Sequence, residues 1–335
     1  MTSNFRTPFK LLLCTTLAAP AFALACSSCG CTLSSDWESQ GLSTTPGLRM
    51  DFRFDYINQN QLRHGRGSAS KSDLANAIAS GSIANPMEAE QYTRNRYYTL
   101  GLDYTYNRAW GVNVQLPYVD RAHGTIQMPP DEVSTSRTKS LGDVKIIGRY
   151  QGFSEAADTG VLFGAKLPTG SRDNNFTGGP ASLAAPPDNA LDRSLQPGTG
   201  STDLILGVYH FEPLNKNWDW FVQGLVQTAL RTRDGFRPGD SLNVNLGLRY
   251  LEFESVVPQI QINARAVRHD TDNGNGSADP ANSGGQLAYL SPGVTVALSK
   301  TAKVYGFLQL PLYQNVNGYQ LAPRWSASIG ANIGF

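Results

Sequence analysis

The residue types with the clearest capacity for chemistry are three cysteines near the amino terminus. Cys26, Cys29 and Cys31 follow a C-x-x-C-x-C spacing, in which thiolates could bind a soft metal ion such as Cu(I) or Zn(II). Structural zinc sites normally have four ligands, and no histidine is near, so a complete site would need a partner. The alternatives are a disulfide from Cys26 to Cys29 or Cys31 with one spare thiol, and lipidation of Cys26.

A second group of reactive side chains consists of charged residues that alternate with apolar ones. Between Leu48 and Tyr56, every second residue is charged. A strand directs successive side chains to opposite faces, so this run would have one apolar and one charged face. On this pattern we expect the following residues to face the lumen of a barrel: Arg49, Asp51, Arg53, Asp55, Asp103, Asp143, Lys145, Arg149, Lys166, Asp203, Arg249, Arg265 and Arg324.

These lumen-facing charges allow two interpretations. Opposite charges can pair across or along the wall of a narrow barrel, which would fill and stiffen its interior. Alternatively, they can form a constriction that selects a small polar or anionic solute.

Twelve segments carry the alternation, and their lengths indicate the fold class. They are residues 48–56, 98–106, 110–118, 143–150, 161–167, 203–208, 220–231, 242–250, 259–266, 290–298, 304–312 and 324–335. Most have roughly the 9–11 residues of a tilted membrane strand, whereas strands of soluble sheets average about 5–6 residues. The mean hydropathy of −0.30 is compatible with this, because only alternate residues would face lipid. We therefore predict an all-β fold, a transmembrane antiparallel up-and-down β-barrel of about 12 strands.

The connections between these segments alternate in length. The long ones hold most of the Gly-, Ser-, Asn- and Pro-rich sequence and cover residues 59–92, 120–140, 170–199, 232–239, 269–285 and 313–320. The short ones cover residues 107–109, 151–159, 212–217, 251–257 and 299–302. Long loops outside and an even number of strands place both termini in the periplasm. Helical spacing of Leu74 and Ile78 predicts a short helix within the first long connection.

Aromatic residues are distributed as two belts at the ends of the predicted strands. We expect Trp110, Trp220, Tyr150 and Tyr250 at the periplasmic interface, and Tyr56, Tyr98, Tyr118 and Trp325 at the outer interface.

The amino terminus has the order of features of an exported protein. Arg6 and Lys10 precede an apolar run, and Ala23-Leu24-Ala25 provides small residues for cleavage. This order of features predicts that residues 1–25 are a signal peptide. The apolar run is shorter than the roughly 20 residues of a membrane-spanning helix. Residues 26–46 would be a periplasmic segment that carries the cysteines and could plug the barrel or act as a tether. Residues 47–335 would form the barrel.

The sequence does not indicate catalysis or nucleic-acid binding. His64, His123, His210 and His269 lack the local motif of the Ser-His phospholipases that occur on twelve-stranded barrels, so no catalytic residue is expected. No cofactor is expected either, apart from a soft metal ion at the cysteines. The 28 basic and 27 acidic residues nearly cancel, whereas nucleic-acid binding needs a concentrated basic face.

Several short motifs resemble those of the meta-pathway phenol-degradation family of outer-membrane transporters, which is placed near the long-chain fatty-acid channels. The matching segments are Gly142-Asp143, Leu167-Pro168-Thr169-Gly170, Gly198-Thr199-Gly200-Ser201-Thr202-Asp203, Ser283-Gly284-Gly285, Ser291-Pro292-Gly293 and Tyr319-Gln320. The end of the chain, from Trp325 to Phe335, resembles the signal that the barrel-assembly machinery recognises. The resemblance implies a transport role without defining a substrate.

These features together predict an outer-membrane channel or transporter of a Gram-negative bacterium, for a small and hydrophobic or aromatic molecule. The alternatives are a small-solute porin, and a barrel scaffold whose cysteine segment binds metal or a redox partner in the periplasm. The expected partners are outer-membrane lipid, a small-molecule substrate, and the assembly machinery through Phe335.

Overall fold

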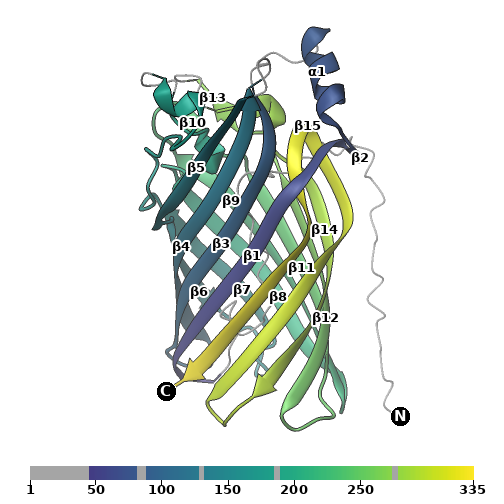
Figure 1. Ribbon diagram of the computed structural model, residues 1–335. Coiled ribbons are helices and arrows are strands. Elements are labelled where there is room, and N and C mark those ends of the chain that lie inside the picture. Colours follow the sequence, from purple (N-terminus) through teal and green to yellow (C-terminus); the bar gives the residue numbers. More distant parts are fainter. Residues whose placement is uncertain (1–44, 81–87, 128–131, 185–188, 274–277) are drawn as a thin grey trace, which may run out of the picture.

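The wall of the protein is one antiparallel sheet that closes on itself (Figure 1). The computed structural model describes residues 45–80, 88–127, 132–184, 189–273 and 278–335. Eleven strands form the wall: β1 (Gly47–Gly65), β3 (Glu88–Thr105), β4 (Trp110–Gln127), β6 (Val144–Tyr150), β7 (Thr159–Leu167), β8 (Thr202–Asn215), β9 (Trp218–Arg231), β11 (Ser241–Tyr250), β12 (Val256–Val267), β14 (Gly285–Ala297) and β15 (Ala302–Gly334). Each pairs with its neighbours in the chain, and β15 pairs with β1 to close the sheet. The predicted all-β antiparallel barrel is confirmed.

The last strand, β15, supplies two segments of the wall. Its first half pairs with β14, and its second half pairs with β1. The two halves run side by side, since the Gly334 amide donates to the Thr301 carbonyl at 2.7 Å and the Ser326 hydroxyl to Gln309 at 2.7 Å. Gly318 has a φ of 53°, a left-handed value that glycine adopts without steric cost, which allows the chain to reverse there. The predicted segments 304–312 and 324–335 are these two halves.

Burial alternates along the wall strands as the sequence pattern requires. On β1, the side chain of Phe52 is 53% exposed, whereas Asp51 and Asp55 are 7% and 2% exposed. In a single closed sheet the buried face is the interior, because the other face has no layer packed on it. The outer surface is therefore apolar and the interior largely polar.

The two ends of the barrel differ in how the strands are connected (Figure 1). At one end, here called the turn end, the connections are residues 106–109, 151–158, 216–217, 251–255 and 298–301. The other, the loop end, carries β2 (Gly67–Ser68), α1 (Lys71–Ala79), β5 (Glu132–Leu141), η2 (Pro180–Leu183), η3 (Arg193–Leu195), β10 (Phe236–Arg237), β13 (Thr271–Asp272) and η4 (Pro280–Asn282). The helix predicted in the first long connection is confirmed as α1. The carboxyl terminus lies at the turn end (Figure 1).

Parts of two predicted loops are extensions of the wall. Residues 120–127 continue β4, and residues 132–141 form β5, which pairs with β4 from Tyr118 to Gln127. The prediction of a connection over 120–140 was wrong because the inward residues of β5, such as Ser134 and Ser136, are small and polar. Without large apolar residues on one face, the alternation that marks a membrane strand is absent. The connection predicted over 59–92 is likewise shortened, by the ends of β1 and β3.

The aromatic belts lie on the outer surface. Near the loop end, the rings of Tyr98 and Tyr118 are 6.4 Å apart, and those of Tyr56 and Trp325 are 5.7 Å apart. At the turn end, the ring of Trp110 lies 4.6 Å from that of Tyr150. Aromatic side chains in these positions suit the two interfaces of a membrane.

Candidate functional site: the barrel interior

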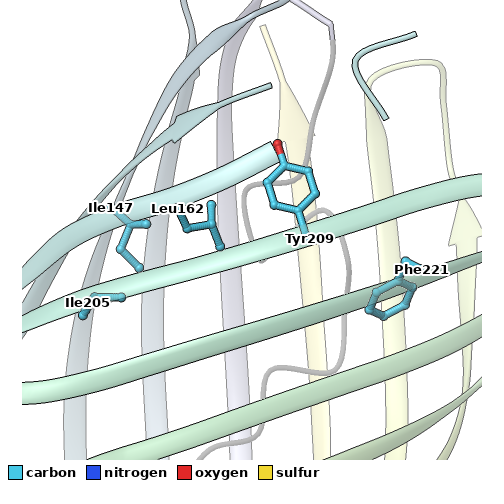
Figure 2. Packing of buried hydrophobic residues seen from close by; sticks show 5 residues of the cluster. All are labelled: Ile147, Leu162, Ile205, Tyr209 and Phe221. Carbon is cyan, nitrogen blue, oxygen red and sulfur yellow. The ribbon is translucent and has the colours of Figure 1, made fainter. Parts of the chain in front are cut away.

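An apolar cluster lies on the inner face of four consecutive strands. Ile147 of β6, Leu162 of β7, Ile205 and Tyr209 of β8, and Phe221 of β9 pack together (Figure 2). Figure 2 shows the first three gathered at one end of the cluster, with Tyr209 and Phe221 spread along it. Ile205 and Phe221 have no exposed surface. The polar interior predicted from the sequence therefore includes an apolar area on one side.

Each large ring of this cluster lies across a glycine of the adjacent strand. A Cβ atom at Gly160 would lie 2.3 Å from the Tyr209 ring, and one at Gly247 would lie 2.2 Å from the Phe221 ring. Glycine is required at both positions because any side chain there would occupy the space of the ring. The Tyr209 hydroxyl donates a short hydrogen bond to the Gln151 side chain at the turn end. These contacts fix the orientation of both rings.

Sequence reasoning did not assign this cluster, although a signal was present. Ile205 and Tyr209 occupy positions on the polar face of their segment, and Phe221 shares a face with Gln223. Apolar residues at inward positions of several adjacent strands are the feature that identifies such an area.

A chain of uncharged polar side chains lies on strands β9, β11, β12 and β14. The Asn245 amide donates to Gln223 at 3.0 Å, and the Asn263 amide donates to Asn245 at 2.9 Å. Ser291 continues the chain by donating to Asn263 at 2.6 Å. All four side chains are buried, so the hydrogen bonds satisfy groups that would otherwise be costly to bury. The interior thus has an apolar area on β6–β9 and an amide area on β9–β14.

Near the turn end, a buried ion pair joins strands that are not neighbours. Arg149 on β6 donates to Asp103 on β3 at 3.2 Å and to the Thr105 hydroxyl at 2.7 Å. The intervening strand, β4, presents Gly111, where a Cβ would lie 2.3 Å from the Arg149 guanidinium. Arg49 on β1 lies 3.8 Å from the same Asp103 carboxylate. Three predicted lumen residues are thus brought together, and glycine provides the space between them.

At the loop end, the Asp143 carboxylate joins three connecting segments. It accepts from the Gly170 amide at 3.0 Å, from the Thr199 amide at 3.0 Å and from the Thr199 hydroxyl at 2.8 Å. Lys166 contacts Asp143 at 2.7 Å and Asp203 at 3.4 Å. Three of the motifs that carried the family resemblance, around residues 142–143, 167–170 and 198–203, therefore meet at one carboxylate.

A third set of charges lies at the seam between β1 and β15. Arg53 donates to Asp55 at 2.8 Å, and the Ser328 hydroxyl donates to Asp55 at 2.6 Å. Asp51 accepts from the Tyr305 hydroxyl at 3.1 Å and 3.0 Å. Asp51 and Asp55 therefore connect β1 to both halves of β15, where the barrel closes.

The connection between β7 and β8 reaches the inner wall. Arg121 on β4 donates to the Ser194 carbonyl at 3.3 Å, as well as to Asn95 at 2.6 Å and Tyr97 at 2.9 Å. Leu191 and Leu195 flank this contact and belong to a small core that also contains Phe176 and Ala181. The connection is thus a packed unit at the loop end. Sequence reasoning missed Arg121 because the prediction placed it in a loop.

The remaining predicted lumen residues differ in burial. Lys145, Arg249 and Arg265 are half-buried, and Arg249 donates to Asp219 at 2.9 Å. Asp219 was not among the predicted residues. Arg324 is exposed, which corrects its predicted position in the lumen.

A β-bulge turns Arg324 outward. The pairing with β1 shifts register between Ile57, which pairs with Ser326, and Gln59, which pairs with Pro323. Between these two pairs, β15 has two residues, Arg324 and Trp325, where β1 has one. Both of these β15 side chains are therefore exposed. Strict alternation from the end of the chain therefore assigned Arg324 to the wrong face.

The metal site predicted at the cysteines lies outside the part of the chain that the structure describes. Cys26, Cys29 and Cys31, together with the predicted signal peptide, fall outside the described residues. Within the described ranges, no group of three or more His, Cys, Asp or Glu side chains is arranged to hold a metal ion. In that same part of the chain, no helix is both long and apolar enough to cross a membrane.

Comparison with solved structures shows that the fold of the barrel resembles that of an outer membrane channel. An outer membrane channel from Pseudomonas putida F1 has a TM-score of 0.60 at 13% identity, with 88% of this chain and 97% of that chain covered. The chain has the fold of that channel. The resemblance to outer-membrane transporters that the sequence motifs suggested is thus confirmed at the level of the fold.

Two further structures show weaker similarity. The β domain of the Bordetella autotransporter BrkA has a TM-score of 0.45 at 14% identity, covering 87% of this chain and all (100%) of that chain. The P. putida toluene transporter TodX has a TM-score of 0.45 at 9% identity, covering 89% and 92%. No family model and no curated protein matches the sequence.

Proposed function

We propose that this protein is an outer-membrane channel that passes a small hydrophobic or aromatic molecule. Its outer surface supports a membrane location, since large apolar side chains such as Phe52, Ile329 and Ile333 are 53%, 60% and 45% exposed on adjoining strands. A continuous apolar surface of this kind is stable in lipid and would cause aggregation in water. The similarity in fold to an outer membrane channel supports the same location.

The proposal that the solute is hydrophobic or aromatic rests on the apolar cluster of the interior. A barrel that passes only ions or sugars needs a polar lining, whereas Ile147, Leu162, Ile205, Tyr209 and Phe221 form an apolar and aromatic area on the inner face. Because Ile205 and Phe221 have no exposed surface, a solute reaches them only when neighbouring side chains move. Low ion conductance together with passage of apolar molecules is therefore expected.

A second candidate, a porin for small polar solutes, is favoured by the amide area. The side chains of Gln223, Asn245, Asn263 and Ser291 would suit hydroxylated solutes. However, these side chains already bond to one another, so a polar solute would have to break those hydrogen bonds before it could bind them.

Uptake and conductance measurements separate the two candidates. Gram-negative cells that produce the protein should take up labelled toluene faster than cells without it, while planar bilayers with the purified barrel should show little ion conductance. Phe221→Gln should reduce toluene uptake several-fold. Phe163→Gln is the matched control, because Phe163 is 42% exposed on the outer face of β7.

The two variants also distinguish a specific effect from poor folding. Both should migrate as folded barrels on unheated gels. Rapid entry of sugars into protein-containing liposomes, with toluene uptake unaffected by Phe221→Gln, would refute the proposal and support the porin.

A further inference from the structure

A group of basic side chains lies on the outer face of the barrel near the loop end. It consists of Arg94 and Arg96 of β3, Arg137 and Lys139 of β5, and Arg324 of β15, here called the outward basic patch. Arg94, Arg137, Lys139 and Arg324 are exposed, and the Arg96 side chain is 33% exposed. In the wall of a membrane barrel, exposed charges on the outer face are costly unless they meet a polar partner at the interface.

The strand register brings four of these residues close together. Arg94 and Arg137 both pair with Ala122 of β4, one from each side. Arg96 and Lys139 flank Asp120 in the same way. Neighbouring strands lie about 4.8 Å apart, so each of these two rows places its cations within about 10 Å of each other.

The charge of the patch is only partly neutralised. Asp120 accepts hydrogen bonds from two guanidinium nitrogens of Arg137, at 3.2 Å and 2.9 Å, and lies 3.7 Å from Arg96. It is the one acidic side chain paired with the patch in the described part of the chain. Five cations against one carboxylate leave a strongly positive surface.

The patch lies just beyond the aromatic belt of the loop end. On β3, Arg96 lies two residues closer to the loop end than Tyr98. The ring of Tyr98 is 5.1 Å from that of Phe54 and 6.4 Å from that of Tyr118. Arg324 likewise precedes Trp325, whose ring is 5.7 Å from Tyr56. Such belts mark the level of lipid headgroups, so the patch lies where headgroup phosphates would be.

The bulge at Arg324 adds to this arrangement. Without the extra residue, regular alternation would turn Arg324 into the interior, away from the patch. The bulge instead exposes a cation beside Trp325, at the same level as the cations of β3 and β5. Bulges commonly redirect a side chain in this way.

We propose that the outward basic patch binds the phosphate groups of lipopolysaccharide in the outer leaflet. Arginine forms bidentate, charge-assisted hydrogen bonds with phosphate, and the aromatic belt beneath provides contact for acyl chains. This inference rests on the proposed outer-membrane location, with the loop end facing outward. It does not depend on which solute crosses the barrel.

Binding of purified lipid A by the full-length protein tests the proposal. Native mass spectrometry in detergent should show lipid A bound to the wild type. The variant Arg94→Gln/Lys139→Gln/Arg324→Gln leaves the Asp120 pairs intact, so the wall should fold normally. Its affinity for lipid A should fall by about tenfold or more, because three cations that would attract the headgroup phosphates are removed.

The control removes the same number of charges at the opposite end. Arg108→Gln/Lys216→Gln/Lys300→Gln alters exposed residues in turn-end connections and should bind lipid A as the wild type does. Dephosphorylated lipid A should bind weakly to every variant. Equal binding of phosphatidylglycerol and lipid A, or unchanged binding by the patch variant, would overturn the proposal. Because no solute flux is measured, either result leaves the channel proposal untouched.

Discussion

At the scale of single residues, the interior shows how charges and rings are accommodated in a narrow barrel. Arg149 reaches Asp103 across a strand that presents only Gly111 beneath it. Tyr209 and Phe221 lie over Gly160 and Gly247 in the same manner. A large side chain and a glycine on the adjacent strand therefore form a unit, and the identity of the smaller residue is as constrained as that of the larger one.

The variant Gly111→Ala tests this constraint. The added Cβ would lie 2.3 Å from the Arg149 guanidinium, so the Asp103 pair must distort or the backbone must shift. We expect a loss of about 2 kcal/mol in the free energy of unfolding, typical of overpacking in a core. Urea unfolding in detergent measures this loss. Gly224→Ala is the control, because no atom lies within 4 Å of a Cβ at Gly224. A similar loss in both variants would mean that strand glycines matter for another reason.

At the scale of elements, the connection between β7 and β8 is attached at Asp143, which lies in the short connection between β5 and β6. This carboxylate receives backbone and side-chain hydrogen bonds from Gly170 and Thr199, and an ion pair from Lys166. The connection has its own small core as well. We therefore expect residues 171–184 and 189–201 to behave as one structured unit whose attachment depends on Asp143.

Asp143→Asn should loosen this unit without opening the barrel. Asparagine retains an acceptor for one amide but loses the charge that faces Lys166, which is 4% exposed. Since Lys166 keeps its contact with Asp203, the cost should be about 2 kcal/mol rather than the full cost of an unpaired buried charge. Limited proteolysis should cleave within residues 171–201 at a lower protease concentration. Asp158→Asn, at the exposed turn end, should leave the cleavage pattern unchanged.

The loop end should also respond to pH through Asp270, which lies between β12 and β14 and is 3% exposed. Burial raises its pKa from 3.8 to about 6, although the Gly239 amide that it accepts at 2.8 Å acts in the opposite direction. A raised pKa means that the folded loop binds the proton more tightly than the unfolded chain. Its contribution to stability is thus fully present below about pH 4 and is lost as the pH rises through about 6.

Hydrogen exchange of the amides in residues 268–273 and 278–284 can follow this dependence. The change between the two limits should be at most about 3 kcal/mol, because one pKa unit corresponds to about 1.4 kcal/mol. Asp270→Asn mimics the protonated form, so it should remove the dependence and protect the loop at pH 7. If this variant keeps the pH profile of the wild type, another group is responsible.

The strands and the first helix could be predicted from the sequence where their apolar and polar faces differ clearly. The segments at residues 48–56 and 242–250 correspond to parts of β1 and β11, and the helix at 71–79 is α1. β5 was missed because its inward serines and threonines have no periodic apolar signal. Arg324 was misplaced because a bulge depends on pairing with a distant strand, which local alternation does not reveal.

At the scale of the whole molecule, closure depends on contacts between the two ends of the chain. Asp51 and Asp55 on β1 bond to Tyr305 and Ser328 on β15. Alternation predicted the inward position of both carboxylates, but their partners lie more than two hundred residues away and follow from the register alone. Local alternation likewise does not predict the apolar cluster, because its residues come together only where four strands lie side by side. Twelve segments were predicted and eleven strands form the wall, because the last two segments are the halves of β15. The inward positions of many charges could be predicted, whereas the contacts that they make could not.

A substitution at Phe335 can test folding and recognition by the assembly machinery separately. Its side chain is 74% exposed, while its backbone amide donates to the Leu48 carbonyl at 2.9 Å, a bond that Phe335→Ala retains. Surface substitutions of this kind usually change the free energy of unfolding by less than about 0.5 kcal/mol, so the purified variant should refold in detergent like the wild type. If Phe335 is the signal for the assembly machinery, the amount of folded barrel in the outer membrane of cells should nevertheless fall several-fold. Phe253→Ala, at a comparably exposed ring of the turn end, should assemble normally. Normal assembly of Phe335→Ala would show that the end of the chain is a structural strand without a separate recognition role.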